Sequence, residues 1–411
     1  MKTIKNYTYW ILLLFFTLIG AWLIPFLVKK ITVEAEKYPF LYYSSVVKEL
    51  CIIDYKDKEA PVREINGKTY TTIAQADSIL PLFKYRQLLS EGRLPDSING
   101  QAVTVQKIRA KNVVYRFSPS AIGTPQSGLY IMYESMPKRV GFESPGDVFR
   151  LDDVIEFVDI ESNTVNPEKS KLFKDALLKE GFRFPAQWVN GNMNPRKPYD
   201  EGYFVLDAKG QLFHLKMVNG RPFVGNTNAG SKVDVAWFEM LEVADKRFYG
   251  FLYDQAGNIY IIGNEGGKYE LRRLGIEPLD LKKDQLSILG NMLYWTVTVT
   301  TEKGRDYYGL DMETLDRLSE YHVAKTPGRW EKASTWLFPF YFTFEDSNSN
   351  YLYPRLHTNG FYGLVSNVFL TLAIVILVKR PGRQKIIGGL WVLVFGLPGM
   401  LANLLLPCDK S

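Results

Sequence analysis

A short basic turn between two apolar runs near the C-terminus constrains this chain more than any other feature. The runs are residues 361–378 and 386–407, and each is long enough, at about 1.5 Å per residue, to cross a hydrocarbon core of roughly 30 Å. The turn between them, residues 379–385, holds four cations: Lys379, Arg380, Arg383 and Lys385. Short loops rich in Lys and Arg stay on the cytoplasmic side of a membrane. The sequence therefore predicts a transmembrane hairpin with a cytoplasmic turn.

A third apolar run, residues 9–28, lies close to the N-terminus. Its apolar core, at about 18 to 20 residues, is longer than the roughly 7 to 15 residues of a signal-peptide core, and no small-x-small cleavage site follows it. We therefore expect an uncleaved transmembrane helix rather than a cleaved signal peptide. Three spans with an inside turn place residues 1–8 in the cytoplasm and residues 29–360 and 408–411 outside. The runs hold no Asp, Glu, Lys, Arg or His, so no ion or proton pathway is expected.

The composition suits a β-rich outer domain. Aromatic residues make up 14% of the chain, with 25 Tyr and 25 Phe, which is typical of sheets and of membrane-interface belts. The net charge of +6 is modest for 411 residues, so no nucleic-acid partner is expected. The two cysteines, Cys51 and Cys408, exclude a disulfide framework. A bridge between these two and a pair of unpaired thiols both remain open.

Two helices are expected in the outer domain. Residues 75–94 carry apolar side chains at helical spacing and predict a short amphipathic helix, with Pro81 marking an internal start or break and Gly92 as its cap. The second helix has clearer signals, because Asn166 can cap it, Pro167 suits the first helical position and Gly181 can end it. Residues 335–344 are aromatic and contain a proline, which fits either a segment at the membrane interface or a buried edge strand.

The rest of the outer domain has the alternating apolar pattern of short strands, and part of it repeats. Residues 204–217 and 251–262 align with an offset of 47 residues, and each runs from an apolar strand through Asp-x-x-Gly into a second apolar strand. A weaker copy, residues 308–315, lacks the glycine. This period is typical of β-propeller blades, and other antiparallel β architectures remain open. We expect a mainly β ectodomain with a few short helices, plus three transmembrane α-helices.

Polar and small residues within the apolar runs predict close helix packing. Asn367 and Asn403 lie at similar depths in the predicted hairpin and could bond to each other across it. Gly396 and Gly399 give the last run a small surface for a neighbouring helix.

The sequence assigns no catalytic residue, no cofactor and no metal ligand. A phosphate-binding loop and a G-x-S-x-G elbow are absent, and the histidines have no metal-ligand spacing. Two acidic groups, Asp200-Glu201 and Asp152-Asp153 with Glu156, could supply an acid/base pair or bind calcium, but their spacing is that of surface turns. Whether the protein is an enzyme stays open, with the balance against it.

A long polar loop before the first repeat is the best candidate for a contact with a partner or ligand. We call residues 190–202 the contact loop. Its candidate contact residues are Asn190, Asn192, Arg196, Lys197, Tyr199, Asp200 and Glu201. A plain surface connection is the alternative.

Residues 197–204 and 209–216, with 80–89 and 92–95, resemble a family of domains of unknown function. The resemblance implies envelope proteins of Gram-negative anaerobes with one span before the ectodomain and two after it. It also implies genes that lie beside those of ABC transporter components, and it supplies no catalytic residues.

The sequence and the resemblance together predict an inner-membrane, multi-pass protein whose main domain is periplasmic. The expected function is an accessory or structural subunit of an ABC-type transport or envelope-assembly system, with the membrane and ABC permease and ATPase subunits as partners. The alternative is a self-contained periplasmic enzyme or a cofactor- or ligand-binding ectodomain on a membrane anchor. A sensor is disfavoured because the cytoplasmic segments are short.

Overall fold

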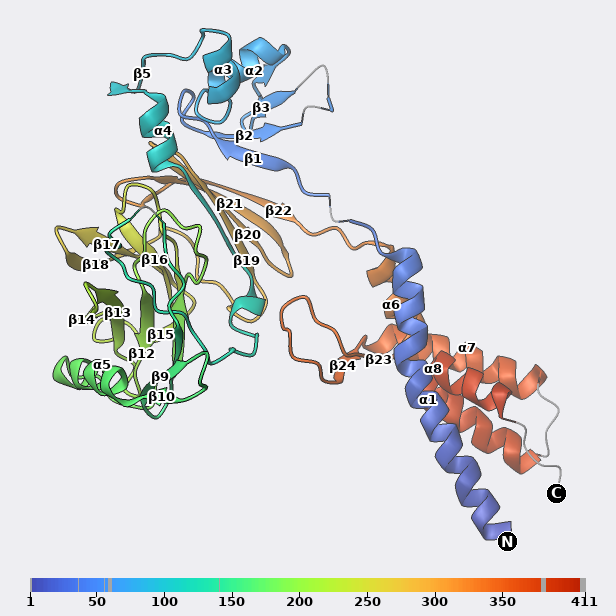
Figure 1. Cartoon of the computed structure of the whole chain (residues 1–411). Helices are drawn as coiled ribbons and strands as arrows, with labels where there is room; N and C mark the ends of the chain where they lie inside the picture. The colour runs from blue at the N-terminus through green and yellow to red at the C-terminus, as the bar shows by residue number, and fades with distance from the viewer. Residues whose placement is uncertain are drawn as a thin grey trace. The chain divides into compact units, whose positions relative to one another are not determined.

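A computed structural model describes residues 2–35, 37–54, 56–57, 61–139, 141–377 and 382–406 of the chain (Figure 1). The chain forms two compact units. One joins Met1–Tyr38 to Lys325–Ser411, and we call it the helical unit; the other, Pro39–Ala324, is the β-rich unit.

The β-rich unit is built from several antiparallel sheets. The first has the order β1 (Phe40–Tyr43), β2 (Leu50–Ile53), β3 (Val62–Glu64) and β4 (Thr69–Tyr70). Two smaller sheets contain β8 (Asp147–Leu151), β9 (Ile155–Asp159) and β10 (Val165–Asn166), and β5 (Ser97–Ile98) with β6 (Gln101–Ala102). The mainly β character of the chain agrees with its aromatic and β-branched strand sequences.

Two four-stranded sheets follow each other in the chain with the same strand order. One contains β11 (Trp188–Gly191), β12 (Tyr203–Leu206), β13 (Leu212–Val218) and β14 (Arg221–Asn226). The other contains β15 (Val235–Met240), β16 (Phe248–Asp254), β17 (Ile259–Glu265) and β18 (Lys268–Arg273). A five-stranded sheet combines β7 (Val113–Phe117) with β19 (Gln285–Gly290), β20 (Tyr294–Thr300), β21 (Gly304–Asp311) and β22 (Arg317–Ala324).

The repeated sequence forms the turn between the second and third strands of both four-stranded sheets. Asp207 follows β12, and its carboxylate accepts a hydrogen bond from Gln211 N at 2.8 Å. Asp254 ends β16, and its carboxylate accepts one from Asn258 N, also at 2.8 Å. The glycines of the two turns have φ values of +74° and +86°, which favour residues without a Cβ. The two turns are therefore built in the same way.

The weaker copy forms a longer turn at a different place. Asp311 ends β21, and its N–H donates to Asp316 O at 3.1 Å, one residue further along than in the other two turns. Leu315 takes the left-handed position there, with φ +63°. This turn joins β21 to β22, so it does not occupy the position of the other two in its sheet.

Neighbouring sheets share hydrophobic cores. Trp237 and Phe251, from the sheet β15–β18, pack with Trp295 of the five-stranded sheet. On the other side of the same sheet, Phe238 packs with Phe204 of β12. Apolar side chains therefore face a partner sheet on both surfaces of these strands.

Short helices connect the sheets: α2 (Ile73–Ile79), α3 (Tyr85–Ser90), α4 (Val105–Lys111), the 3₁₀ turn η1 (Pro119–Ala121) and α5 (Pro167–Lys179). The prediction of α5 is confirmed, and the Asn166 side chain accepts a hydrogen bond from Lys169 N at 3.0 Å. The break predicted at Pro81 within residues 75–94 is confirmed, and the chain there does not form a single helix. The chain there forms α2 and α3, because Pro81 follows the end of α2 and cannot donate the next helical hydrogen bond.

The helical unit holds the apolar runs. Its elements are α1 (Lys2–Thr32), α6 (Arg329–Leu337), β23 (Phe340–Thr343), β24 (Arg355–Thr358), α7 (Phe361–Leu377) and α8 (Gly382–Leu405). α1 packs against α8, α6 and β23, and α7 packs against α8. Residues 335–344 form the end of α6 and the strand β23, which pairs with β24 in a two-stranded sheet.

The expected fold class, with its three transmembrane helices, is wrong. In the part of the chain that the structure describes, two helical stretches are long and apolar enough to cross a membrane, Tyr7–Thr32 and Lys385–Leu405. The third apolar stretch, Phe361–Ile376, is shorter, and at 1.5 Å per residue its 16 residues extend only about 24 Å. Core helices of soluble proteins and signal sequences can have the same length and apolar composition. The finding is a mainly β protein with two candidate apolar helices.

Helix α8 is broken at Gly396, whose φ of +60° and ψ of −141° are not helical. The break leaves carbonyls without their usual helical donors, and Asn367 Nδ2 of α7 donates to Leu393 O at 2.9 Å. An added Cβ on Gly396 would lie closer to Asn367 Oδ1 than any normal contact. Asn367 and Asn403 are both buried, and Asn403 lies beside Gly388. Gly399 lies against Trp391 and Phe395.

Part of the predicted basic turn lies inside α8. Arg383 and Lys385 belong to the helix, which begins at Gly382 rather than after residue 385. Lys379 and Arg380 lie outside the described residues, as does Cys408. Cys51 is a buried free thiol in β2.

Candidate functional site

The contact loop runs from β11 into β12 and combines an exposed tip with a buried base. The tip is Met193, Asn194, Pro195 and Arg196, all exposed to solvent. At the base, the side chains of Lys197 and Asp200 are each only 1% exposed. A lysine buried to this extent requires anionic partners, because an unpaired buried charge is costly.

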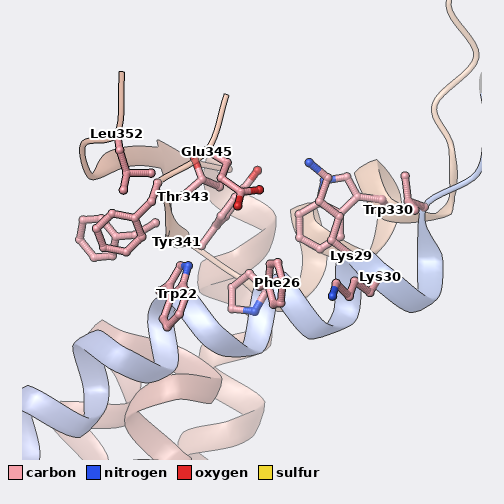
Figure 2. A pocket seen from close by; sticks show the side chains of 13 residues that line it. Trp22, Phe26, Lys29, Lys30, Trp330, Tyr341, Thr343, Glu345 and Leu352 are labelled. Atoms are coloured by element: carbon pink, nitrogen blue, oxygen red, sulfur yellow. The ribbon is translucent and has the colours of Figure 1, made fainter. Parts of the chain in front are cut away.

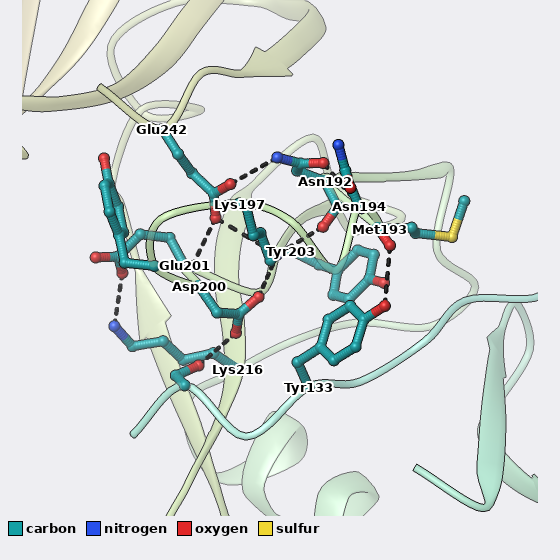
Figure 3. A network of polar contacts seen from close by, with 12 residues as sticks. Tyr133, Asn192, Met193, Asn194, Lys197, Asp200, Glu201, Tyr203, Lys216 and Glu242 are labelled. Atoms are coloured by element: carbon teal, nitrogen blue, oxygen red, sulfur yellow. Dashed lines mark hydrogen bonds and ion pairs between the residues drawn. The ribbon is translucent and has the colours of Figure 1, made fainter. Parts of the chain in front are cut away.

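Figure 3 shows Lys197 at the centre of a polar network. Its ammonium pairs with the Asp200 carboxylate, lies 3.5 Å from Glu242 Oε1 and donates to Asn192 O at 2.6 Å. The aromatic ring of Tyr133 lies 5.3 Å from the same nitrogen, within the range of a cation–π contact. The network joins the loop to a residue that follows β15.

The carboxylates of the network have further donors. Asp200 Oδ2 accepts from Ser135 Oγ at 2.5 Å, and Glu242 Oε2 accepts from Asn192 Nδ2 at 2.7 Å. The second oxygen of Glu242 accepts from Glu201 N at 3.0 Å. Burial raises the pKa of Glu242, and the charge of Lys197 opposes that shift. Lys197 therefore favours the ionised form of this carboxyl group.

A second ion pair closes the end of the loop. Glu201 Oε2 lies 2.6 Å from Lys216 Nζ of β13, and the Glu201 carbonyl lies 2.6 Å from His214 Nε2. His214 is fully buried and stacks on Phe204 with ring centroids 4.6 Å apart. Burial, with a smaller effect from Lys216, lowers the pKa of His214 to about 3. This histidine is therefore neutral near pH 7 and serves as a structural group.

The path of the loop tip is also defined. Asn192 Oδ1 accepts from Asn194 N at 3.0 Å, and Asn194 Oδ1 accepts from Arg196 N at 2.9 Å, so two successive Asx turns shape the tip. The hydroxyl of Tyr133 donates to Met193 O at 3.0 Å. The tip therefore presents its side chains from a fixed backbone.

The structure brings the seven predicted contact residues together in one loop but gives them different roles. Lys197, Asp200 and Glu201 are buried, Asn190 Oδ1 accepts from Met240 N at 3.0 Å, and the Tyr199 hydroxyl donates to Val243 O. Arg196 is the predicted residue that extends into solvent from the tip. Sequence reasoning missed three partners of the loop: Ser135, Lys216 and Glu242. Ser135 and Glu242 lie more than 40 residues from the loop positions they contact, so spacing gave no signal for either.

The acidic groups considered from the sequence lie in separate settings. Asp200 and Glu201 take part in ion pairs with different lysines. Asp152 and Asp153 lie exposed in the turn between β8 and β9, and Glu156 pairs with Arg150 at 2.5 Å. Within the described ranges, no group of three or more His, Cys, Asp and Glu side chains could hold a metal ion.

Comparison with known proteins identifies a sequence family and similar solved structures. A sequence family described as "Domain of unknown function (DUF4857)" matches residues 40–310. No curated protein matches the chain. Among solved structures, the β-propeller domain of Cps50 (Swd1) from Myceliophteria thermophila is similar, with 12% sequence identity and a TM-score of 0.27. That match covers 49% of this chain and 57% of the propeller domain, so the chain spans less than two thirds of it.

The family match extends over more than half of the chain and includes most of the β-rich unit, with the whole contact loop. The protein therefore belongs to the DUF4857 family of domains of unknown function.

Proposed function

We propose that this protein is an accessory subunit of an ABC-type transport or envelope-assembly system in the inner (cytoplasmic) membrane. In this proposal the apolar helix α1 anchors the chain, and the β-rich unit lies in the periplasm. The contact loop presents its tip to a partner protein of the complex. The resemblance to envelope proteins encoded beside ABC transporter components supports this choice of system.

The observation that carries the proposal is the contrast between the base and the tip of the contact loop. An ion network that is almost completely buried fixes the base, while four consecutive residues of the tip stay exposed. Buried ion pairs contribute little net stability compared with apolar residues of similar size. A network of this kind is better explained by a need to hold one loop conformation, and a fixed backbone reduces the entropy lost on binding.

The tip has the chemistry of a protein contact. Met193 is 41% exposed and offers a flexible apolar side chain, and Arg196 of the same tip is also exposed. Methionine and arginine are both enriched in the buried centres of protein interfaces. We expect an acidic residue of the partner to pair with Arg196.

Affinity purification of the full chain from native membranes in a mild detergent, followed by quantitative mass spectrometry, tests the proposal. Wild type should recover an ATPase and a permease in stoichiometric amounts. Arg196→Glu should lose most of this recovery, because it reverses the charge at the tip. The control Lys209→Glu makes the same change in an exposed hairpin turn and should keep it. Recovery of the chain alone, or equal recovery with both variants, would overturn the proposal.

A further inference from the structure

The helical unit contains an apolar pocket of about 680 Å³ (Figure 2). One wall is a single face of α1, where Trp22, Phe26, Lys29 and Lys30 follow each other at helical spacing. The opposite wall is formed by β23 and the residues after it, with Trp330 of α6 near Lys29. This volume lies in the range of pockets that enclose small molecules.

The wall formed by α1, which we call the floor of the pocket, is aromatic. The ring of Trp22 meets that of Phe344 edge to face, with centroids 5.6 Å apart, and stacks on Phe26 at 6.2 Å. Trp22 and Phe26 belong to α1, which exposes apolar side chains along its length, among them Leu23 and Leu27. The pocket therefore opens beside a surface suited to hydrocarbon.

Two cations stand at one end of this floor. Lys30 Nζ lies 4.6 Å from the centroid of the Phe26 ring, and Lys29 Nζ lies 6.0 Å from that of Trp330. Among the described residues, no carboxylate lies within ion-pair distance of either ammonium. The neighbouring acids Glu34 and Asp346 pair with arginines instead, at 2.9 and 3.4 Å. Glu345 also lines the pocket, so its charged lining carries two positive groups and one negative group.

One histidine contacts two residues of the opposite wall. His357 of β24 lies 2.8 Å from Thr343 Oγ1, and its ring stacks on Tyr341. Burial is the main cause that lowers the pKa of His357, and the charge of Lys29 lowers it further. His357 is therefore neutral near pH 7, so it adds no positive charge of its own to the pocket.

We propose that this pocket binds an anionic phospholipid, with one acyl chain along the aromatic floor and the phosphate at Lys29 and Lys30. The ligand must be amphiphilic, because the apolar floor and the cations are adjacent along one helix. From Trp22 to Lys30, the helix rises about 12 Å at 1.5 Å per residue, which separates chain and head group as a lipid does. Basic pockets beside apolar helices are known sites for anionic lipids.

Lysines at the end of a helix can also act in a simpler way, which must be distinguished from specific lipid binding. Lys29 and Lys30 lie in the last turn of α1, where their charges interact favourably with the helix dipole. Their long side chains can extend toward the head group of any lipid. A general effect of this kind requires no pocket and gives no preference for one lipid at a fixed site. The proposal therefore predicts a saturable site that prefers an anionic head group. It rests on the membrane anchoring proposed above.

The test uses the full chain in nanodiscs of phosphatidylcholine, titrated with phosphatidylglycerol. Retained lipid is counted by native mass spectrometry after release into detergent. Wild type should retain about one phosphatidylglycerol and should not exchange it for glycerol phosphate. The double variant Lys29→Gln/Lys30→Gln should bind at least about tenfold more weakly, and Glu345→Gln should bind more tightly, since it removes the negative group.

The matched control is Lys37→Gln/Lys332→Gln, which removes two exposed cations of the helical unit that do not line the pocket. It should bind as wild type does. A second variant, Phe26→Ser, should also weaken retention, because it removes part of the apolar floor and the ring that Lys30 contacts. Equal binding by the Lys29/Lys30 variant and its control, or displacement by glycerol phosphate, would overturn the lipid site. If wild type does not fractionate with membranes, the anchoring in the proposed function fails instead.

Discussion

The two lysine sites of this protein differ in what surrounds their charge. In the β-rich unit, Lys197 is enclosed and contacts two carboxylates, a carbonyl and an aromatic ring. In the helical unit, Lys29 and Lys30 contact aromatic rings, and no described carboxylate pairs with them. A buried charge with a complete set of partners holds the structure together. Cations beside an open apolar pocket lack such partners and can bind an external anion.

The largest expected effect breaks the enclosed site. Lys197→Met leaves Asp200 and Glu242 facing each other without a cation, so we expect a loss of about 3 to 5 kcal/mol in the free energy of unfolding. Urea unfolding of the full chain, followed by near-ultraviolet circular dichroism, measures it. Lys209→Met, an exposed control, should stay within about 0.5 kcal/mol of wild type.

The matching triple variant sharpens this result. Adding Asp200→Asn and Glu242→Gln to Lys197→Met removes the repelling charges, so the triple variant should be more stable than the single one. If Lys197→Met is no less stable than Lys209→Met, the network does not hold the loop.

A second prediction concerns the break in helix α8 at Gly396. Gly396→Ala places a Cβ against Asn367 and forces alanine to φ +60°, so we expect a loss of about 2 to 3 kcal/mol. Thermal unfolding in detergent measures the change. Gly388→Ala, at a helical position where the added Cβ lies 3.4 Å from Asn403, should have a clearly smaller effect. Equal effects would show that the break at Gly396 requires no glycine.

A third prediction concerns the effect of pH through His214 of β13, which contacts Glu201 at the end of the contact loop. The pKa of His214 is lowered from 6.5 to about 3, so the unfolded chain binds more protons than the folded one between these values. The contribution of His214 to the free energy of unfolding is therefore fully present above pH 6.5, and it is lost as the pH falls toward 3. At pH 5 the loss should be about 2 kcal/mol relative to pH 7.5.

Urea unfolding of wild type and His214→Gln at the two pH values isolates this effect. The variant starts from lower stability, because it loses the ring stacking on Phe204, but its decrease between pH 7.5 and pH 5 should be smaller. An identical decrease in both proteins would mean that groups other than His214 cause it.

The smallest expected effect is at the open site. Lys29→Gln/Lys30→Gln should change the free energy of unfolding by less than about 0.5 kcal/mol, because surface charges without partners contribute little. Thermal unfolding in detergent without added phosphatidylglycerol measures it. A loss comparable to that of Lys197→Met would mean that these lysines are structural, and the contrast between the two sites would fail.

Local signals in the sequence predicted local structure well. The cap at Asn166 and the Asp-x-x-Gly turns depend on residues within a few positions of each other, and the structure places Asp207 and Asp254 in matching turns. The contact loop could be located as a long polar segment, but its buried base could not. Glu242 reaches Lys197 only because β15 packs beside β11, which no pattern in the loop encodes.

For the expected membrane helices, the sequence did not predict where each helix begins, ends or breaks. Apolar composition located α1, α7 and α8, but composition does not fix where a helix begins or breaks. Helix α7 is too short to pass as a span, and α8 begins before residue 385 and breaks at Gly396. The sequence also could not predict the proposed lipid pocket, because the pocket is formed by α1 and by residues about 300 positions later in the chain.

The most direct test of the proposed function is photo-crosslinking in native membranes from a photoreactive residue at position 196, compared with one at position 209. Both positions are exposed, and position 196 alone lies on the contact-loop tip. The proposal predicts one dominant crosslink from position 196, to a component of an ABC-type complex, and none to that component from position 209. No crosslink from position 196, or the same products from both positions, would contradict it.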